Sequence, residues 1–296
     1  MAYLGPTTDA GSAHLQCALF SSLHDCGYIE GKNLLVERRF AEGEYDRLEA
    51  LAAELAAFKP DVLFVSGTQG AIAVSRVTRT IPVVFVTVSY PVAMGLVRSL
   101  AYPGTNMTGL VNPSDVLSRA RLHLLKELVP KAKKVAVLHN LKNAVESLML
   151  AAIREANEKL RMSLPQLAVT SEQDLSMAFD TLSELRPDAL YVIESPLNFM
   201  HRARIVASVS EECLPAVYGF SEFAEAGGLM SYSTSLVEQF SAAADFIDKI
   251  FRGAKPAELP VAQPAKFELV INLNTAKALD VTFPRSVLQR ADRVIE

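Results

Sequence analysis

Short runs of β-branched and other apolar residues alternate along this chain with segments in which apolar residues recur every three or four positions. The first pattern is typical of buried strands and the second of helices that pack one face on a sheet. Residues 46–58 show the helical pattern clearly, because Leu48, Leu51, Ala52 and Leu55 form one stripe. We expect strands at residues 2–4, 34–40, 62–65, 83–88, 107–110, 135–138, 167–169, 190–193, 216–218 and 229–232. The alternation predicts a parallel α/β fold.

An internal repeat divides the chain into two similar halves. The segment KPDVLFV at residues 59–65 is echoed by RPDALYV at residues 186–192, each after a helical pattern and each opening a strand. Downstream, PVVF at 82–85 matches PAVY at 215–218, and AMGLV at 93–97 matches AGGLM at 226–230. Two copies are too few for a solenoid, which needs roughly three or more. The repeat predicts two similar doubly wound parallel-sheet lobes joined by a hinge.

The repeat also indicates where the chain passes from one lobe to the other. We expect an N-terminal lobe of residues 1–111 with about 235–260, and a C-terminal lobe of residues 112–234 with about 261–296. Asn112-Pro113 and Ser233-Thr234-Ser235 are the candidate hinges, because turn-forming residues cluster there. A third crossing is expected in the proline-rich stretch of residues 256–264.

Charge and cysteine content exclude several classes of protein. The 296 residues contain 29 Lys and Arg against 33 Asp and Glu, a net charge of −4 with no long basic block, which argues against nucleic acid as a partner. Three cysteines at no metal-ligand spacing predict neither a structural disulfide nor a metal site. The common nucleotide, hydrolase and metalloprotease motifs are absent from the sequence, so we expect no cofactor. A loose basic cluster is interpreted as a solvated face and consists of Arg119, Arg121, Lys126, Lys131, Lys133 and Lys134.

Two segments bear on membrane association. Residues 80–97 carry no charge, but Pro82 and Pro91 interrupt them and the β-branched residues favour a strand over a membrane-spanning helix. The first five residues have neither the basic nor the apolar region of an export signal. We therefore expect either a cytoplasmic protein or one whose leader is missing from this chain.

Polar residues after the predicted strands are the candidate ligand-binding residues, because open parallel sheets bind ligands beyond the carboxyl ends of their strands. In the first lobe these are Thr7, Thr8, Ser66, Gly67, Thr68, Gln69, Ser89 and Tyr90. In the second lobe they are Asn140, Glu194, Ser195, Tyr218, Phe220 and Glu222. Asn140 is preferred to His139, which is more often a hydrogen-bonded neighbour. Helix capping alone would account for the first-lobe threonines, a tight turn for residues 66–70, and a surface capping turn for Glu222.

Several long segments resemble one family of transport proteins. They are GYIEGKN at 27–33, AEGEYDRL at 41–48, GTNMTG at 104–109, EFAEAGGLMSY at 222–232 and PAKFELVINL at 264–273. They are similar to the substrate-binding proteins of ABC transporters in the tryptophan-binding TrpX-like group, a branch of the type I periplasmic binding fold. The resemblance implies an extracytoplasmic monomer that closes two lobes around a small organic ligand and delivers it to a membrane permease.

The resemblance also bears on the ligand, for which it implies an aromatic or hydrophobic amino acid or a related aromatic carboxylate. This family often has an aspartate in the segments where this chain has Ser89-Tyr90-Pro91 and Glu194-Ser195-Pro196. Glu194 or Glu222 would then supply the carboxylate for a ligand ammonium group. An alternative is an amino-acid racemase-like enzyme with an acid/base group at equivalent strand ends of both lobes. The effector domain of a transcription regulator is a third hypothesis, although no helix-turn-helix precedes residue 2.

Overall fold

The computed structural model describes residues 1–296 and divides them into two compact units. Unit 1 comprises Met1–Pro113 and Leu236–Ala265, and unit 2 comprises Ser114–Ser235 and Lys266–Glu296. The chain passes from unit 1 to unit 2 for the last time after Ala265. Val261 is buried in the core of unit 1 and its N–H donates to the Leu100 carbonyl at 2.8 Å, while Ala262 bridges Leu110, so these residues stay with the first sheet.

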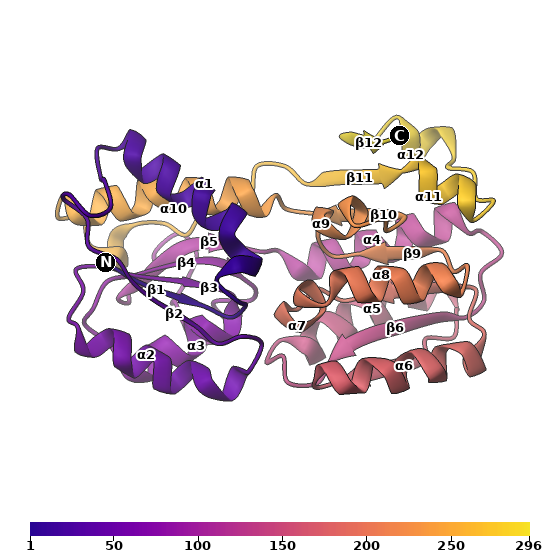
Figure 1. Ribbon diagram of the computed structural model, residues 1–296, viewed down its shortest axis with the longest axis horizontal. Helices are drawn as coiled ribbons and strands as arrows, with labels where there is room; N and C mark the ends of the chain where they lie inside the picture. Colours follow the sequence, from indigo (N-terminus) through magenta and orange to yellow (C-terminus); the bar gives the residue numbers. More distant parts are fainter. The chain divides into compact units, whose positions relative to one another are not determined.

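Unit 1 is built on a five-stranded parallel sheet of order β2-β1-β3-β4-β5, with α1 and α10 on one face and α2 and α3 on the other (Figure 1). Its strands are β1 Ala2–Gly5, β2 Glu37–Phe40, β3 Leu63–Ser66, β4 Val83–Val88 and β5 Met107–Val111. Its helices are α1 Ala13–Asp25, α2 Leu48–Ala57, α3 Thr68–Val77 and α10 Leu236–Phe251, with short 3-10 turns η1 Ala10–Ser12, η2 Tyr45–Arg47 and η3 Pro256–Glu258. The predicted stripe of Leu48, Leu51, Ala52 and Leu55 is buried on the sheet, which confirms that helix.

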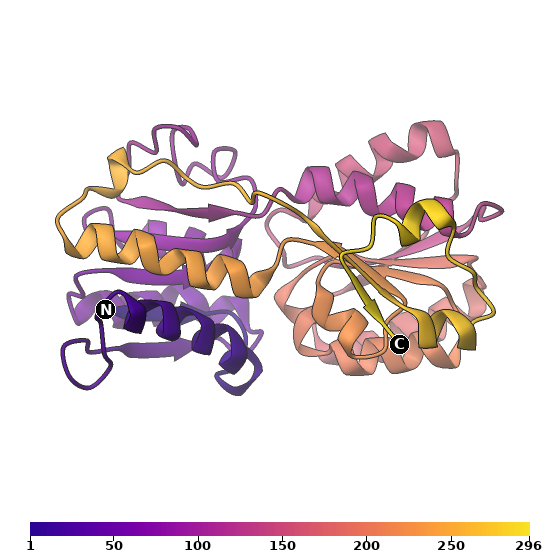
Figure 2. The same cartoon turned by 90° about the horizontal axis from the view of Figure 1, so that it is seen from above.

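Unit 2 is built on a seven-stranded sheet of order β12-β11-β10-β9-β8-β6-β7, flanked by helices (Figure 2). Its strands are β6 Val135–Asn140, β7 Gln166–Val169, β8 Ala189–Val192, β9 Ala216–Tyr218, β10 Met230–Ser233, β11 Glu268–Asn272 and β12 Arg293–Ile295. Its helices are α4 Ser114–Leu128, α5 Glu146–Leu160, α6 Glu172–Leu185, α7 Pro196–Met200, α8 Arg202–Glu211, α9 Ser221–Glu225, α11 Leu273–Ala278 and α12 Arg285–Leu288. Both units have the predicted α/β architecture.

Two strands of unit 2 were not expected. β11 runs antiparallel to β10, with Tyr232 opposite Leu269, so this sheet is not wholly parallel. β12 then pairs with β11 in parallel. Both strands are short and belong to the segment that returns after the third crossing, and no repeat unit covers them. Their assignment depends on the partner strand, which lies far away in the sequence.

The repeat is expressed in backbone conformation as well as in sequence. Lys59 and Arg186, which occupy equivalent positions before β3 and β8, both adopt positive φ values, 51° and 44°. Phe85 of β4 and Tyr218 of β9 are also equivalent, and both are fully buried. The same strand-and-turn unit has therefore been used twice.

Residues 80–97 form β4 and a turn-rich loop. No helix in the chain combines the length and apolar character that crossing a bilayer would require. Cys17, Cys26 and Cys213 are all free and exposed.

Candidate ligand-binding site

The candidate residues of unit 1 meet at one edge of its sheet. β1, β3 and β4 are adjacent and parallel, so the loops that follow them leave the sheet on the same side. These loops carry Thr7 and Thr8, then residues 66–69, then Ser89 and Tyr90. The structure therefore brings all three predicted segments of unit 1 together.

The turn between β3 and α3 is held by a glycine backbone conformation and by several hydrogen bonds. Gly67 has φ +81°, a conformation that L side chains rarely adopt, and its N–H lies 3.0 Å from the Val86 carbonyl and 3.1 Å from Thr87 Oγ1. Thr68 Oγ1 accepts a 2.9 Å hydrogen bond from the N–H of Ser89. α3 begins at Thr68, and a helix N-terminus carries partial positive charge that attracts anions. Ser66 and Gln69 flank this turn.

The loop after β1 is held by hydrogen bonds to both of its threonines. Thr8 Oγ1 accepts a 3.0 Å hydrogen bond from the Gly11 N–H, which fixes the turn into η1. Thr7 is buried, and its carbonyl accepts from the N–H of Glu42 at 3.1 Å. A turn hydrogen bond thus accounts for the Thr8 hydroxyl oxygen, while the N-cap residue of η1 is Asp9.

The loop after β4 is held in an uncommon backbone conformation. Thr87 and Tyr90 have φ values of 56° and 53° although neither is glycine. Gln239 of α10, which was not among the predicted residues, accepts the Thr87 N–H through Oε1 at 2.9 Å. Residues held in sparsely populated conformations need support from their surroundings and are concentrated at functional sites. Ser89 is buried here and Tyr90 is half-buried.

The candidate residues of unit 2 also meet at one edge, where the adjacent parallel strands β6, β8 and β9 end. Asn140 is the last residue of β6 and is buried, and its Oδ1 accepts from the Lys142 N–H at 2.9 Å. Ser195 follows β8 and caps α7 by accepting the Asn198 N–H at 3.1 Å. Phe220 follows β9 and packs edge-on against Phe199, with ring centroids 5.7 Å apart.

Arg121 corrects the sequence analysis, because it does not belong to a solvated basic face. Its side chain is fully buried beneath α4, with Nη1 paired to Glu194. Nε donates to the Tyr232 carbonyl at 2.6 Å, and Nη2 donates to the Gly219 carbonyl at 3.2 Å. A single guanidinium therefore joins the segments that follow β8 and β9 to β10. The missed signal is positional, since Arg121 lies on the same helical stripe as the buried Leu117 and Leu125.

Glu194 is consequently already compensated by a positive charge. Burial alone would lower the pKa of Arg121, but the Glu194 carboxylate and Tyr191 raise it overall, so the guanidinium stays charged. Glu194 was expected to supply a carboxylate for a ligand ammonium, and in the structure its Oε2 is paired with the Arg121 guanidinium.

Tyr218 is a second correction. Its side chain is only 1% exposed, lies in the core with Leu190 and Val192, and stacks on Phe223 at a centroid distance of 4.9 Å. Burial raises its pKa well above the ordinary value of 10.0. In a strand, neighbouring side chains point to opposite faces, and Tyr218 points into the core rather than along the strand end. Glu222 lies in the first turn of α9 and is partly exposed, as the capping interpretation describes.

A buried pair at the end of β6 was missed. His139 is 1% exposed and Glu146, the first residue of α5, is 4% exposed, with Nδ1 and Oε1 3.1 Å apart. Burial raises the pKa of Glu146, against an opposing effect of His139. The missed signal is positional here too, since Glu146 lies on the same helical stripe of α5 as the buried Met149, Leu150 and Ile153. No group of three or more His, Cys, Asp or Glu side chains is placed to hold a metal ion.

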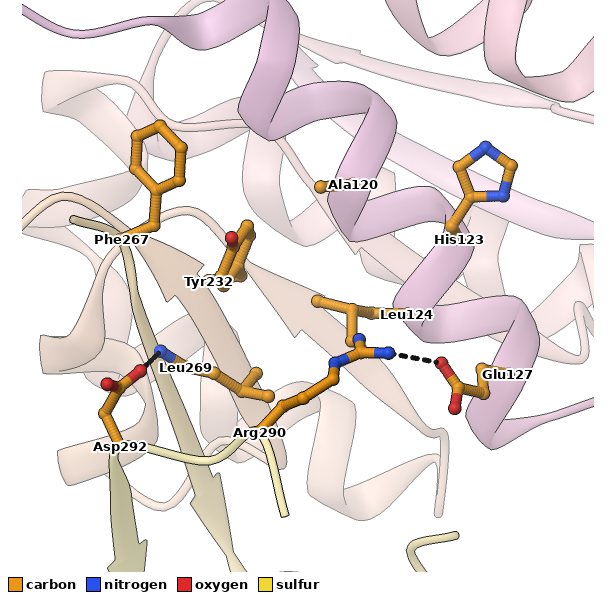
Figure 3. Close-up of a pocket in the computed structure, with 9 residues that line it drawn as sticks. All are labelled: Ala120, His123, Leu124, Glu127, Tyr232, Phe267, Leu269, Arg290 and Asp292. Carbon is orange, nitrogen blue, oxygen red and sulfur yellow. Dashed lines mark hydrogen bonds and ion pairs between the residues drawn. The ribbon is translucent and has the colours of Figure 1, made fainter. Parts of the chain in front are cut away.

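Unit 2 also has an open hollow of about 520 Å³ between α4, β10 and the segments around β11 and β12 (Figure 3). Tyr232 and Phe267 form an edge-to-face pair on one side, 5.8 Å between centroids, and an Arg290–Glu127 ion pair of 3.2 Å closes another. None of the predicted residues lines it.

Known proteins resemble this chain over nearly its whole length. The sequence profile of the family described as ABC transporter substrate binding protein matches residues 11–295. A tyrosine-binding protein of Clostridioides difficile strain R20291 is 26% identical over 261 residues, covering 88% of this chain and 74% of that protein.

Solved structures agree in fold. A conserved domain protein of Vibrio cholerae O1 biovar El Tor superposes with a TM-score of 0.91 at 26% identity, covering 99% of this chain and 98% of that one. An ABC domain from Streptococcus pneumoniae, solved in complex with L-Trp, gives a TM-score of 0.89 at 23% identity with 99% of both chains covered. With its paired α/β units and a family match spanning almost every residue, this chain belongs to the ABC transporter substrate-binding proteins.

Proposed function

We propose that this protein binds a small aromatic amino acid or a related aromatic carboxylate and delivers it, unchanged, to an ABC permease. The observation that carries the proposal is the edge of unit 1, where three adjacent strands end in hydroxyl groups and in the N-terminus of α3. Thr68 Oγ1 accepts from Ser89, which leaves its hydroxyl proton for an acceptor such as a ligand carboxylate. The tyrosine-binding relative and the L-Trp complex support an aromatic side chain.

Residues of unit 1 carry this proposal. Gly67 and Thr68 hold the carboxylate through backbone N–H groups and a hydroxyl. The half-buried ring of Tyr90 packs against the ligand's aromatic portion. In unit 2 the candidates are Asn140 and Phe220. The protein acts outside the cytoplasm, as a monomer, and without nucleic acid.

Binding rather than turnover is favoured over the racemase-like alternative. A two-base racemase needs an acid/base group at equivalent strand ends of the two units. The internal repeat aligns Gly67 with Glu194, and glycine has no side chain to exchange a proton. The residue Cys213 precedes β9, at the strand end opposite to the candidate site. Nothing in the comparisons favours the racemase.

Calorimetric titration with L-tyrosine, L-tryptophan, L-phenylalanine and benzoate, against L-leucine and L-glutamate, tests the proposal. Saturable binding of an aromatic compound, recovered unchanged after incubation, is expected. Thr68→Val should weaken it about tenfold, the value of one hydrogen bond to a charged group. Thr80→Val is the matched control, since Thr80 is exposed and lies after α3, at the other edge of the sheet. Conversion of the ligand, or absence of binding by every aromatic compound, would overturn the proposal.

A further inference from the structure

β4 contains a β-bulge just before the candidate ligand-binding edge of unit 1. Phe85 pairs with Gly109 of β5. Three residues further along β4, Val88 pairs with Val111, which is only two residues further along β5. The extra residue lies between these pairs, where Thr87 has φ +56°. Bulges redirect the residues that follow them and are frequent beside functional sites.

The internal repeat does not account for this conformation. Thr87 lies two residues after Phe85, and Phe220 lies two residues after the equivalent Tyr218. Phe220 has an ordinary extended backbone, with φ −141°. A positive φ is sterically unfavourable for a β-branched residue. Thr87 therefore needs support from its surroundings, which Phe220 does not.

Two neighbouring elements provide that support. α10 packs on β4 and β5 (Figure 1), and its fourth residue, Gln239, accepts the Thr87 N–H through Oε1 at 2.9 Å. This bond gives the bulged residue a partner outside the strand ladder. The Gln239 side chain is 4% exposed, so the bond is shielded from water. On β5, Gly109 makes room for the bulge, since a Cβ there would lie 1.9 Å from the Phe85 carbonyl oxygen.

The bulge in turn holds the turn that carries the proposed carboxylate site. Thr87 Oγ1 accepts from the Gly67 N–H at 3.1 Å. The N–H of Ser89 donates to Thr68 Oγ1 at 2.9 Å. Both contacts come from within two residues of the bulge, so their geometry depends on the backbone conformation of Thr87. A series of hydrogen bonds thus connects Gln239 to the turn at residues 67–68.

We propose that Gln239 is a positioning residue for the ligand-binding edge of unit 1. It holds the β4 bulge, and through the bulge the turn at residues 67–68, in the conformation that receives the ligand carboxylate. This inference rests on the proposed function and adds to it a residue that acts through its neighbours. A site that already has its binding geometry loses less conformational freedom when the ligand arrives. Without Gln239 the bulge relaxes, and the free energy needed to restore it weakens binding.

Calorimetric titration with L-tyrosine, L-tryptophan and benzoate tests the inference, with urea unfolding to confirm that each variant is folded. Gln239→Met removes the acceptor and keeps a side chain of similar length, and it should weaken binding about fivefold to tenfold, the upper range for one hydrogen bond. Asn106→Leu is the matched control. Asn106 Nδ2 donates to the Ile81 carbonyl at 2.7 Å, so this variant also loses an amide-to-backbone bond, but at the opposite edge of the same strand pair. Its affinity should stay within about twofold of the native protein.

A double-mutant cycle with Thr87→Gly provides a readout that a merely structural role would not move. Glycine adopts a positive φ without support, and the Gly67 N–H keeps the Val86 carbonyl at 3.0 Å as an acceptor. Adding Gln239→Met to Thr87→Gly should therefore weaken binding by less than about a further twofold. Gln239→Asn, whose shorter side chain withdraws the oxygen from Thr87, should also weaken binding and provides the readout if Gln239→Met does not fold.

The outcomes distinguish this inference from the proposed function. Native affinity in Gln239→Met, an equal loss of affinity in Asn106→Leu, or effects of Gln239→Met and Thr87→Gly that multiply fully in the double variant would each overturn the positioning role. The proposed function would still stand in those cases. Absence of binding by the native protein to every aromatic compound would overturn both.

Discussion

The two sheet edges contain the same repeated segment but differ in charge. In unit 1, β3 ends at Ser66 and the next residue is Gly67. The edge there is built from backbone N–H groups and hydroxyls. In unit 2 the equivalent residue is Glu194, which is buried and paired with Arg121. Lys59 and Arg186 show that the preceding backbone turn is the same in both.

The side chain at this one position determines which stabilising partners the rest of the unit must provide. Gly67 needs only local partners, Val86 and Thr87 on the neighbouring strand. Glu194 requires a counter-charge, because a buried carboxylate without one is expensive. That charge comes from α4, 73 residues away in the sequence.

Removing the counter-charge should have the largest effect. Arg121→Met leaves Glu194 buried without this positive charge, and should lower the free energy of unfolding by about 3–5 kcal/mol. Arg119→Met on the same helix removes only partly exposed ion pairs and should cost less than about 1 kcal/mol. Urea unfolding measures both.

The double variant Arg121→Met/Glu194→Gln separates charge from packing. If the unpaired carboxylate is the cause, the double variant should be more stable than Arg121→Met alone. Equal instability of the two would mean that the guanidinium contributes by packing and by its bonds to backbone carbonyls.

Alanine substitution of one glycine at each edge separates the cost of a steric clash from the cost of an unfavourable backbone conformation. A Cβ at Gly219 would lie 2.5 Å from the Cβ of Glu194, so Gly219→Ala must displace that residue and should cost about 2 kcal/mol. At Gly67 the nearest atom would be Pro6 Cγ at 3.6 Å, and only the positive φ opposes alanine, at about 1 kcal/mol. Thermal and urea unfolding should rank Gly219→Ala as the less stable variant, and the reverse order would contradict the steric account.

The hydroxyls at equivalent positions of the repeat should matter to similar extents. Thr68 accepts the Ser89 N–H, and Ser195 accepts the Asn198 N–H. Thr68→Val and Ser195→Ala should each lower the free energy of unfolding by about 1 kcal/mol, because each leaves a backbone donor unpaired. A loss below about 0.3 kcal/mol in either would indicate that water replaces the hydroxyl.

Two carboxyl groups of unit 2 should respond to pH with opposite signs. Burial holds the pKa of Glu146 above its ordinary 4.5, so the folded state keeps this proton more tightly and loses stability as the pH rises through the folded pKa. Relative to the native protein, Glu146→Gln should therefore gain stability as the pH rises above the ordinary pKa of 4.5.

Asp188 provides the opposite case. The N–H groups of Lys133 and Lys134 hold its pKa below the ordinary 3.8, so its contribution is present above that pH and is lost as the pH falls through the folded pKa. Asp188→Asn should be less stable than the native protein at pH 7, with the difference shrinking in acid. Urea midpoints across the pH range measure both variants, and a shared sign would contradict the assignment.

Much of the fold followed from local patterns. Ten strands and the helix α2 were predictable, because the period of their apolar residues reflects which of their faces is buried. β11 and β12 were not predicted. The partner and direction of such a short strand are determined by the sheet that it joins. The candidate strand-end residues were found by topology, because parallel strands place their loops on one edge.

Burial of individual side chains was harder to predict than the elements that carry them. Tyr218 and Phe220 both follow from the same strand-end argument, yet Tyr218 is fully buried in the core cluster, whereas Phe220 lies beyond β9 and is only partly buried against that cluster. Arg121 looked like a surface charge until its stripe on α4 was placed against the sheet. Glu146 likewise lies on the buried stripe of α5, with Met149 and Ile153.

The sequence by itself determined the α/β class, the twofold repeat and the family, since all three are recorded in periodicity and in order along the chain. Only the tertiary structure decided which charges are buried and how they are paired. Arg121 meets Glu194 across 73 residues of sequence, and His139 meets Glu146 across the turn from β6 to α5. The reason is physical, because the cost of a buried charge is determined by everything that surrounds it in space, and its neighbours along the chain are only a part of that environment.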